Sequence, residues 1–242
     1  HVICCVRDIN RFNPTKSLRD SISVIEIDLL NNSSLKNIPI DIDVAYYLVH
    51  SMSSAKDYTL LEQKSAINFR NALKGTAIKQ VIYLSGIVNE ASLSEHLSSR
   101  KGVEQELEKG IYNFTCLRAG IIIGSGSASF EMLRHLTHRL PVMTTPKWVS
   151  NKTHPIAIRD VLWYLRNAAK LEKPVAGVFD IGGPEILSYA DMMQKFAKLS
   201  GLRKRLIIKV PVLTPKLSSL WIGFVTPVPT SLARPLVGSL IS

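Results

Sequence analysis

The chain has 242 residues, of which 46% are apolar and 20% charged, so it can bury a sizeable hydrophobic core. No stretch reaches the roughly 18 consecutive apolar residues of a membrane span, and no secretory signal pattern opens the chain. The three cysteines, Cys4, Cys5 and Cys116, form neither a C-x-x-C pair nor a metal-ligand spacing with a histidine. We therefore expect a globular protein of the reducing cytoplasm without a metal site.

The formal net charge of +11 is concentrated toward the C-terminus, because no Asp or Glu follows Asp191. The basic residues of this tail are Lys195, Lys198, Arg203, Lys204, Arg205, Lys209, Lys216 and Arg234. Such a tail either attracts an anionic partner or is a solvated face. Trp221, Ile222, Phe224 and Val225 lie within it, so peripheral contact with an anionic membrane is one expectation. We do not expect nucleic acid as a partner.

Four short apolar runs in the first part of the chain are typical of buried strands. They cover residues 2–6, 24–27, 44–49 and 80–84. The runs are continuous rather than alternating, which indicates burial on both faces, as in a parallel sheet. Residues 57–74 and 93–107 carry apolar positions near helical spacing, and a further strand is expected at 114–117. The sequence thus predicts successive strand–helix–strand units with right-handed crossovers.

The second half of the chain starts with a Gly-Ser-Gly-Ser loop at 124–127. Beyond it we expect helices at 129–138, 159–170 and 188–200, the last with Ser188 as its N-cap, an irregular loop at 141–154 and a strand at 177–181. Prolines interrupt the tail from residue 206 onward and preclude one long helix there. We expect residues 1–122 to form the core and 123–242 mainly a second lobe and tail, with 155–181 returning to the core.

Several ordered motifs carry a family resemblance that covers nearly the whole chain. They are VRD at 6–8, DL at 28–29, YYLVHSM at 46–52, LRAGIIIGSG at 117–126, HPIAIRDV at 154–161 and FDIGGP at 179–184. Together they resemble the atypical, extended short-chain dehydrogenase/reductases, in particular the bacterial NAD(P)-binding proteins labelled nucleoside-diphosphate-sugar epimerase-like. The resemblance implies an α/β fold, a doubly wound parallel sheet of the Rossmann type, with a small C-terminal substrate lobe.

The glycine-rich turn of that family does not occur in this sequence. In the family, a first strand leads into G-x-x-G-x-x-G, whose backbone N–H groups bind the cofactor pyrophosphate. His1 falls where the family is already in its second strand, so we expect roughly 25 residues to precede it, on the family's pattern. Without the central first strand, a doubly wound sheet would leave two strand edges unpaired. We likewise expect the chain to continue beyond Ser242.

The resemblance also implies which residues contact the cofactor. The residue after the family's second strand selects between NAD and NADP, and here it is Arg7, whose guanidinium suits the 2′-phosphate of NADP, with NAD as the alternative because Asp8 follows. The remaining implied cofactor residues are Asp28 and Leu29 near the adenine, Leu48, Val49, His50 and Ser51 along the central stretch, and Ala119 and Gly120 near the nicotinamide. Ordinary packing at strand ends is their alternative role.

The catalytic Tyr-x-x-x-Lys of the family is replaced in this chain. None of its tyrosines has a lysine four residues later. His96 occupies the tyrosine position of the family and Arg100 the lysine position. Ser99, between them, and Glu104, further on, match the family. A histidine exchanges protons near neutral pH, whereas an arginine does not deprotonate. Ser85 matches the serine that orients a substrate carbonyl. The candidate catalytic residues are therefore Ser85, His96 and Arg100.

Two functions remain open at this point. The first is an NADP-dependent oxidoreductase or epimerase-like enzyme acting on a small molecule, with His96 and Arg100 replacing the usual pair. The second is a non-catalytic dinucleotide-binding sensor or assembly factor, which the loss of the tyrosine favours. The substrate is not indicated, because specificity in this fold resides in the second lobe and its loops.

Overall fold

The computed structural model describes residues 1–50, 58–87 and 95–210. Its strands are β1 (Val2–Val6), β2 (Ile22–Glu26), β3 (Val44–Tyr47), β4 (Gln80–Gly86), β5 (Asn113–Ala119), β6 (Ile122–Ile123), β7 (Val142–Pro146), β8 (Lys152–Thr153), β9 (Ile156–Ala157), β10 (Gly177–Ile181), β11 (Leu187–Ser188) and β12 (Leu206–Val210). Its helices are α1 (Lys16–Arg19), α2 (Tyr58–Ala72), α3 (Glu95–Glu108), α4 (Ala128–Arg139), α5 (Ile158–Ala168) and α6 (Tyr189–Leu199). No helix in the described part of the chain is long and apolar enough to cross a membrane.

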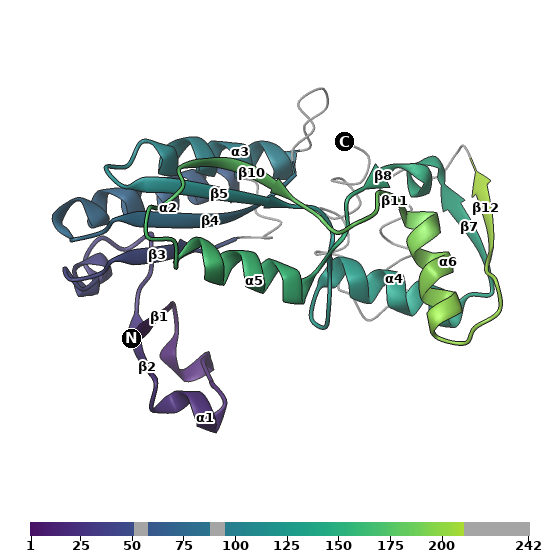
Figure 1. The fold of residues 1–242 in the computed structure, drawn as a ribbon, viewed down its shortest axis with the longest axis horizontal. Coiled ribbons are helices and arrows are strands. Elements are labelled where there is room, and N and C mark those ends of the chain that lie inside the picture. Colours follow the sequence, from purple (N-terminus) through teal and green to yellow (C-terminus); the bar gives the residue numbers. More distant parts are fainter. Residues whose placement is uncertain (51–57, 88–94, 211–242) are drawn as a thin grey trace.

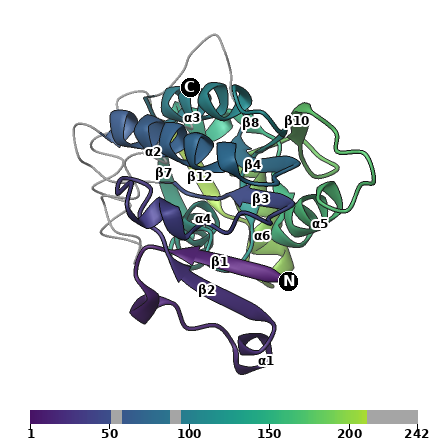
Figure 2. The same ribbon diagram turned by 90° about the vertical axis from the view of Figure 1, so that its left-hand side faces the viewer.

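The central sheet has the order β10-β5-β4-β3 with every neighbouring pair parallel. Helices α2 and α3 cover one face and α5 covers the other (Figures 1 and 2). Because successive side chains of β4 point to opposite faces of the sheet, the core is divided between these two faces. Val81 and Tyr83 pack with residues of α2 and α3, whereas Ile82 between them packs with Val161 and Leu165 of α5. The doubly wound α/β fold expected from the apolar runs is confirmed.

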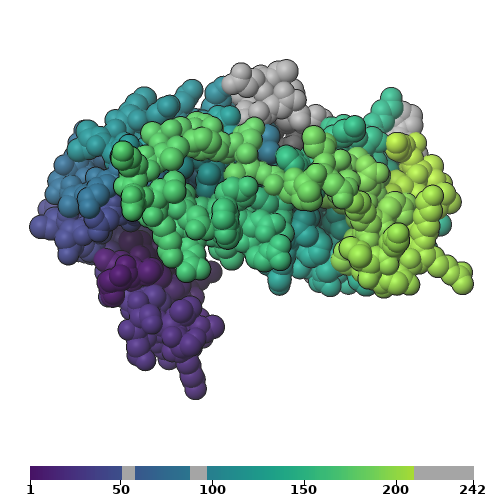
Figure 3. Space-filling model, viewed as in Figure 1, coloured from purple at the N-terminus to yellow at the C-terminus, as the bar shows by residue number. Residues whose placement is uncertain are grey.

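Strands β1 and β2 form a separate parallel pair that is not hydrogen-bonded to the central sheet. Figure 2 shows β1 on the side toward β3, with β2 beyond it, and Figure 3 shows this N-terminal region projecting from the body of the molecule. Within the described residues, β1 and β3 therefore each keep an unpaired edge.

A second lobe packs beside the carboxyl ends of the sheet strands (Figure 1). Its core combines Met132, Leu133 and Leu136 of α4, Met143 of β7, and Met192 and Met193 of α6 with their neighbours. Strand β7 lies where an irregular loop was expected, so that part of the prediction was wrong. The strand is stabilised by β12, with Leu206 paired to Val142, and this partner lies too far along the chain for a local pattern to indicate it.

Helix α6 begins as the sequence predicts. Ser188 caps it: the Asp191 N–H donates to Ser188 Oγ at 3.1 Å, and the Ser188 N–H donates back to the Asp191 carboxylate at 3.0 Å. Beyond Val210 the tail lies outside the described residues, and with it the apolar group around Trp221 on which the expectation of membrane contact rests.

Candidate active site

A cavity of about 970 Å³ opens where the carboxyl ends of β3, β4 and β5 meet the second lobe. The sheet contributes His50 after β3, Ser85 of β4 and Gly120 after β5, and the second lobe contributes Trp148 and Tyr189. In open α/β sheets ligands bind at the carboxyl ends of the strands, because the loops that follow the strands gather there. Its size is also in the range of cavities that hold cofactors and small substrates.

Three of the motifs that carry the family resemblance meet at one wall of this cavity. A Cβ on Gly120 would overlap the carbonyl oxygen of His154, and one on Gly182 would overlap the His154 imidazole. The Gly183 N–H donates to the Pro155 carbonyl at 2.8 Å. The segment at His154 therefore passes between the ends of β5 and β10 with no room for a side chain at either glycine.

Buried polar atoms line the cavity without a partner of their own. Ser85 is 2% exposed, and neither its Oγ nor Arg100 Nε has a hydrogen-bond partner of good geometry among the described residues. The same holds for Trp148 Nε1 on the opposite wall. Arg100 makes one long hydrogen bond, from Nη1 to the Leu84 carbonyl at 3.5 Å. Because buried polar groups are nearly always paired in native proteins, these atoms mark the surface that a bound molecule would satisfy.

The cavity is electropositive. Its charged lining residues are Arg100 and Lys152, and no carboxylate lines it in the described part of the chain. Arg100 also acts on the neighbouring core. Burial raises the pKa of Tyr83 to about 12, and the nearby guanidinium opposes that rise. The Tyr83 hydroxyl consequently stays protonated at neutral pH, while the cavity itself favours negatively charged or oxygen-rich ligands.

His50 lies at the cavity wall and is held by a buried carboxylate. Its Nδ1 lies 2.9 Å from Oε1 of Glu62 on α2, and the side chains are 21% and 7% exposed. The other carboxylate oxygen of Glu62 accepts a short hydrogen bond from Ser99 of α3. The end of β3 and helices α2 and α3 are thus joined through one carboxylate.

Glu104, which matches the family as Ser99 does, has a different role. Its carboxylate accepts two hydrogen bonds from Arg118 of β5, from Nε at 3.0 Å and Nη2 at 2.6 Å. The Cys116 thiol donates to the same carboxylate at 3.3 Å. Burial, reinforced by Glu104, raises the pKa of Cys116, so it remains a thiol. This cluster fastens α3 to the sheet outside the cavity.

The cavity brings together most of the residues singled out by the sequence. Those that line it are Leu48, Val49, His50, Ser85, Arg100, Ala119 and Gly120. Arg7 follows β1 and is exposed, Asp28 accepts from the Leu30 N–H at 2.9 Å to close a turn, and Leu29 packs beside the α2 side of the core. Their cofactor roles stay predictions. Ser51 lies outside the described residues, and His96 lies in the first turn of α3 with its side chain outside them.

Sequence reasoning missed Glu62, Lys152, Trp148 and Tyr189. A signal existed for Glu62, because it shares a helix face with Ala66 and Phe69, four and seven residues later, and both pack in the core. A carboxylate on a buried helix face needs a partner, which here is His50. The second-lobe residues gave no such signal, since they come from an irregular segment and a helix start.

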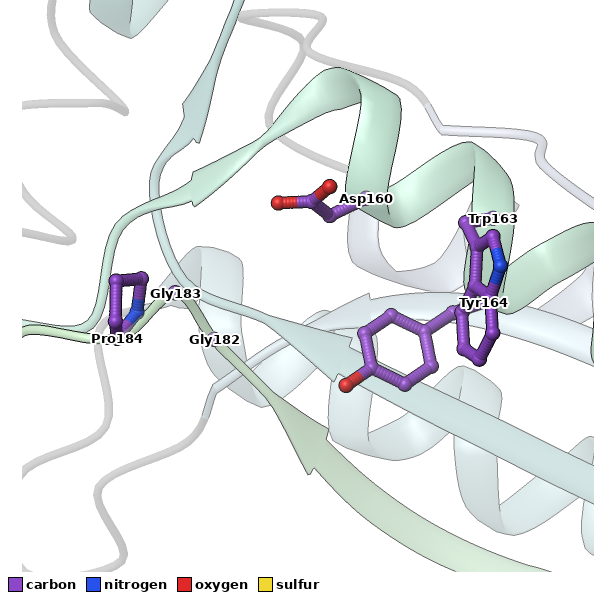
Figure 4. Close-up of a pocket in the computed structure, with 6 residues that line it drawn as sticks. All are labelled: Asp160, Trp163, Tyr164, Gly182, Gly183 and Pro184. Carbon is purple, nitrogen blue, oxygen red and sulfur yellow. The ribbon is translucent and has the colours of Figure 1, made fainter.

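A smaller hollow of about 330 Å³ lies on the outer side of α5 (Figure 4). Asp160, Trp163 and Tyr164 of α5 line it together with Gly182, Gly183 and Pro184 after β10. Asp160 pairs with its neighbour Arg159, and Trp163 stacks edge-on against Tyr164. These side chains are largely exposed, and we place the candidate site in the larger, electropositive cavity.

No protein-family model and no curated protein sequence matches this chain. Solved structures of the same fold do. Triphenylmethane reductase from Citrobacter sp. aligns with a TM-score of 0.75 at 15% identity over 98% of this chain and 79% of the reductase. NADPH-dependent quinone oxidoreductase from Escherichia coli gives 0.74 at 17% identity over 99% and 78%.

UDP-glucuronic acid 4-epimerase from Bacillus cereus gives a TM-score of 0.66 at 20% identity over 100% of this chain and 90% of the epimerase. The chain therefore has the fold shared by NAD(P)-dependent reductases and nucleoside-diphosphate-sugar epimerases, as the resemblance in its motifs implied. At identities this low, the structural similarity establishes the fold alone.

Proposed function

We propose that this protein is an NADP-dependent oxidoreductase that reduces a carbonyl or quinone group of a small molecule in the cytoplasm. The observation that carries the proposal is the cavity at the carboxyl ends of β3, β4 and β5, in which unpartnered buried donors and two basic side chains face one space without a lining carboxylate. Among solved structures of this fold are a triphenylmethane reductase complexed with NADP(H) and a quinone oxidoreductase complexed with NADPH, which supports the choice of cofactor and reaction.

The residues present fit the nicotinamide half of such a cofactor. Gly120 lets the backbone after β5 pack directly on the His154 carbonyl at the cavity wall. Leu48, Val49 and Ala119 give the cavity an apolar wall for the nicotinamide ring. Arg7, exposed at the end of β1, is the candidate for the 2′-phosphate. When bound, the cofactor supplies the hydride.

The protein supplies orientation and charge. The Ser85 hydroxyl is the donor for a substrate carbonyl oxygen, and the Arg100 guanidinium stabilises negative charge that develops there. By sequence position, His96 and Arg100 replace the usual tyrosine and lysine. The Arg100 side chain lines the cavity, and the His96 side chain lies outside the described residues. On the second-lobe side, where Trp148 and Tyr189 pack edge-on against each other, the cavity wall suits an apolar or aromatic substrate body.

Calorimetric titration with NADPH, followed by turnover with a panel of aldehydes, ketones and quinones, tests the proposal. Arg100→Met should lower turnover by roughly tenfold or more, as loss of one charge-stabilising donor does. The matched control is Arg166→Met, since Arg166 is exposed on α5 away from the cavity. NADPH binding without turnover of any substrate would favour the alternative, a dinucleotide-binding sensor or assembly factor. Absence of binding would refute both.

A further inference from the structure

His50 lies at the wall of the cavity, and the carboxylate of Glu62 lies behind it. Glu62 is 7% exposed. One of its carboxylate oxygens lies 2.9 Å from His50 Nδ1, and the other accepts a hydrogen bond from the Ser99 hydroxyl. Its negative charge also acts on two buried tyrosines, Tyr47 and Tyr83. Burial is the main cause of their raised pKa values, and the charge of Glu62 raises these values further. A carboxylate in this setting is costly to bury unless a cation or strong donors compensate it.

The geometry fixes the tautomer of His50. An ionised carboxylate can only accept hydrogen bonds, so the proton between the two groups belongs to Nδ1. Proton exchange with a ligand in the cavity then falls to Nε2. A histidine whose one nitrogen is held by a buried carboxylate and whose ring lines a ligand cavity is the arrangement of a general acid–base residue.

A purely structural link between β3 and α2 would not require a charge. Glutamine at position 62 would accept from His50 through its carbonyl oxygen and donate to the Ser99 hydroxyl through its amide, without the cost of burying a carboxylate. The charge has a use if His50 must become cationic during a reaction. Tyr83, whose pKa burial raises to about 12, remains neutral and does not compete for this role.

We infer that His50 is the proton donor of the proposed reduction and that Glu62 is its positioning residue. The inference rests on the proposed function. His50 Nε2 would give its proton to the carbonyl oxygen as the electron pair of the C=O π bond passes to that oxygen, and the bound cofactor would supply the hydride for the carbonyl carbon. The products are the alcohol, NADP⁺ and neutral His50, which regains its proton from solvent. His50 thus supplies the proton transfer that the missing tyrosine performs in relatives, a role the sequence assigned to His96.

Four variants separate these roles: His50→Gln, Glu62→Gln, His96→Gln and the control His138→Asn, in which an exposed histidine of α4 away from the cavity is changed. We expect His50→Gln to lower turnover by about 100-fold or more, the usual contribution of general acid catalysis, and His138→Asn to change it less than about threefold. His96→Gln measures separately whether the residue in the tyrosine position contributes. Glu62→Gln should lower turnover and leave NADPH affinity within about twofold, because Glu62 does not line the cavity.

The tautomer gives a readout that does not depend on turnover. In the protein without cofactor, ¹⁵N NMR of the imidazoles should show the proton of His50 on Nδ1, and this preference should be lost in Glu62→Leu, whose side chain accepts no hydrogen bond. Thermal unfolding of each variant identifies any loss of fold, and the conservative His50→Asn, which places an amide near Nδ1, should not restore turnover.

Two results would overturn the inference while the proposed function stands: wild-type turnover in His50→Gln, or wild-type turnover in folded Glu62→Gln. A large loss confined to His96→Gln would return the proton transfer to His96. If the unaltered protein neither binds NADPH nor reduces any carbonyl, the proposed function fails and the inference fails with it.

Discussion

Gly120 and His154 touch through their backbones at the wall of the cavity, so closely that a Cβ on Gly120 would overlap the His154 carbonyl oxygen and lie 2.9 Å from its carbonyl carbon. A backbone carbonyl cannot swing aside as a side chain can. The sequence Ala119-Gly120 at the end of β5 is therefore tied to the path of the segment that leads into β9 and α5.

Gly120→Ala should consequently destabilise the fold by about 1–3 kcal/mol, the range for forcing one extra carbon into a packed interior. It should also weaken NADPH binding, because the displaced segment lines the cavity. Denaturant unfolding measures the first effect and calorimetry the second. Gly75→Ala is the control, since its Cβ would meet nothing within 4 Å. Equal stability of the two variants would contradict the close packing at Gly120.

The ion pair of Glu104 with Arg118 should be one of the costliest polar contacts to break. Both side chains are largely buried, and Glu104→Gln leaves Arg118 with an uncompensated charge, so we expect a loss of about 3–5 kcal/mol in the free energy of unfolding. The control is Asp43→Asn, which breaks the solvent-exposed pair with Lys79 and should cause no measurable change. Similar losses from both substitutions would count against the burial described for Glu104.

The capping box of α6 should make stability depend on acid pH. Hydrogen bonds from the Ser188 hydroxyl and backbone N–H hold the pKa of Asp191 below its ordinary value of 3.8. A depressed pKa stabilises the folded state above the ordinary value, and this contribution is lost as pH falls through the folded-state value. Asp191→Asn should cost about 1 kcal/mol at neutral pH, as helix caps do, and progressively less below pH 4.

Urea unfolding of the wild type and Asp191→Asn from pH 7 to pH 3 measures that difference. Asp41→Asn, at an exposed position before β3, is the matched control and should show no such trend. A difference that stays constant down to pH 3 would mean that the Asp191 carboxylate is not the group involved.

The cysteines should differ in reactivity. Burial raises the pKa of Cys116 and also that of Cys5, but Cys116 is buried, whereas Cys4 and Cys5 lie on β1 at intermediate and exposed positions. Because the thiolate is the reactive form, a thiol reagent at pH 8 should modify Cys4 and Cys5 in the native protein and Cys116 only in denaturant. Cys116→Ser should abolish the denaturant-dependent step. Simultaneous modification of all three cysteines in the native state would contradict the burial of Cys116.

The sheet was predictable because its strands are continuous apolar runs, and α6 because Ser188 and Asp191 carry a local capping pattern. Strand β7 was not, since its pairing with β12 depends on residues about 60 positions away in the chain and leaves no local signal. The strand-end residues His50, Ser85 and Gly120 were found through the motifs, and the structure brings them to one cavity.

What sequence reasoning did not reveal is contact between elements. The spacing on α2 identifies Glu62 as a carboxylate on a buried face, but only the packing of α2 against the end of β3 shows that its partner is His50. For the same reason the motif alignment assigned the proton transfer to His96, the residue in the tyrosine position, and gave His50 only a cofactor contact.

The measurement that tests the central claim most directly is transfer of label from NADPH carrying deuterium at the reactive C4 position to a carbonyl substrate, read by mass spectrometry of the alcohol product. An NADP-dependent oxidoreductase should give one carbon-bound deuterium per product molecule, with a rate lowered in Arg100→Met. A product without carbon-bound deuterium, or no product from any carbonyl despite NADPH binding, would contradict the account.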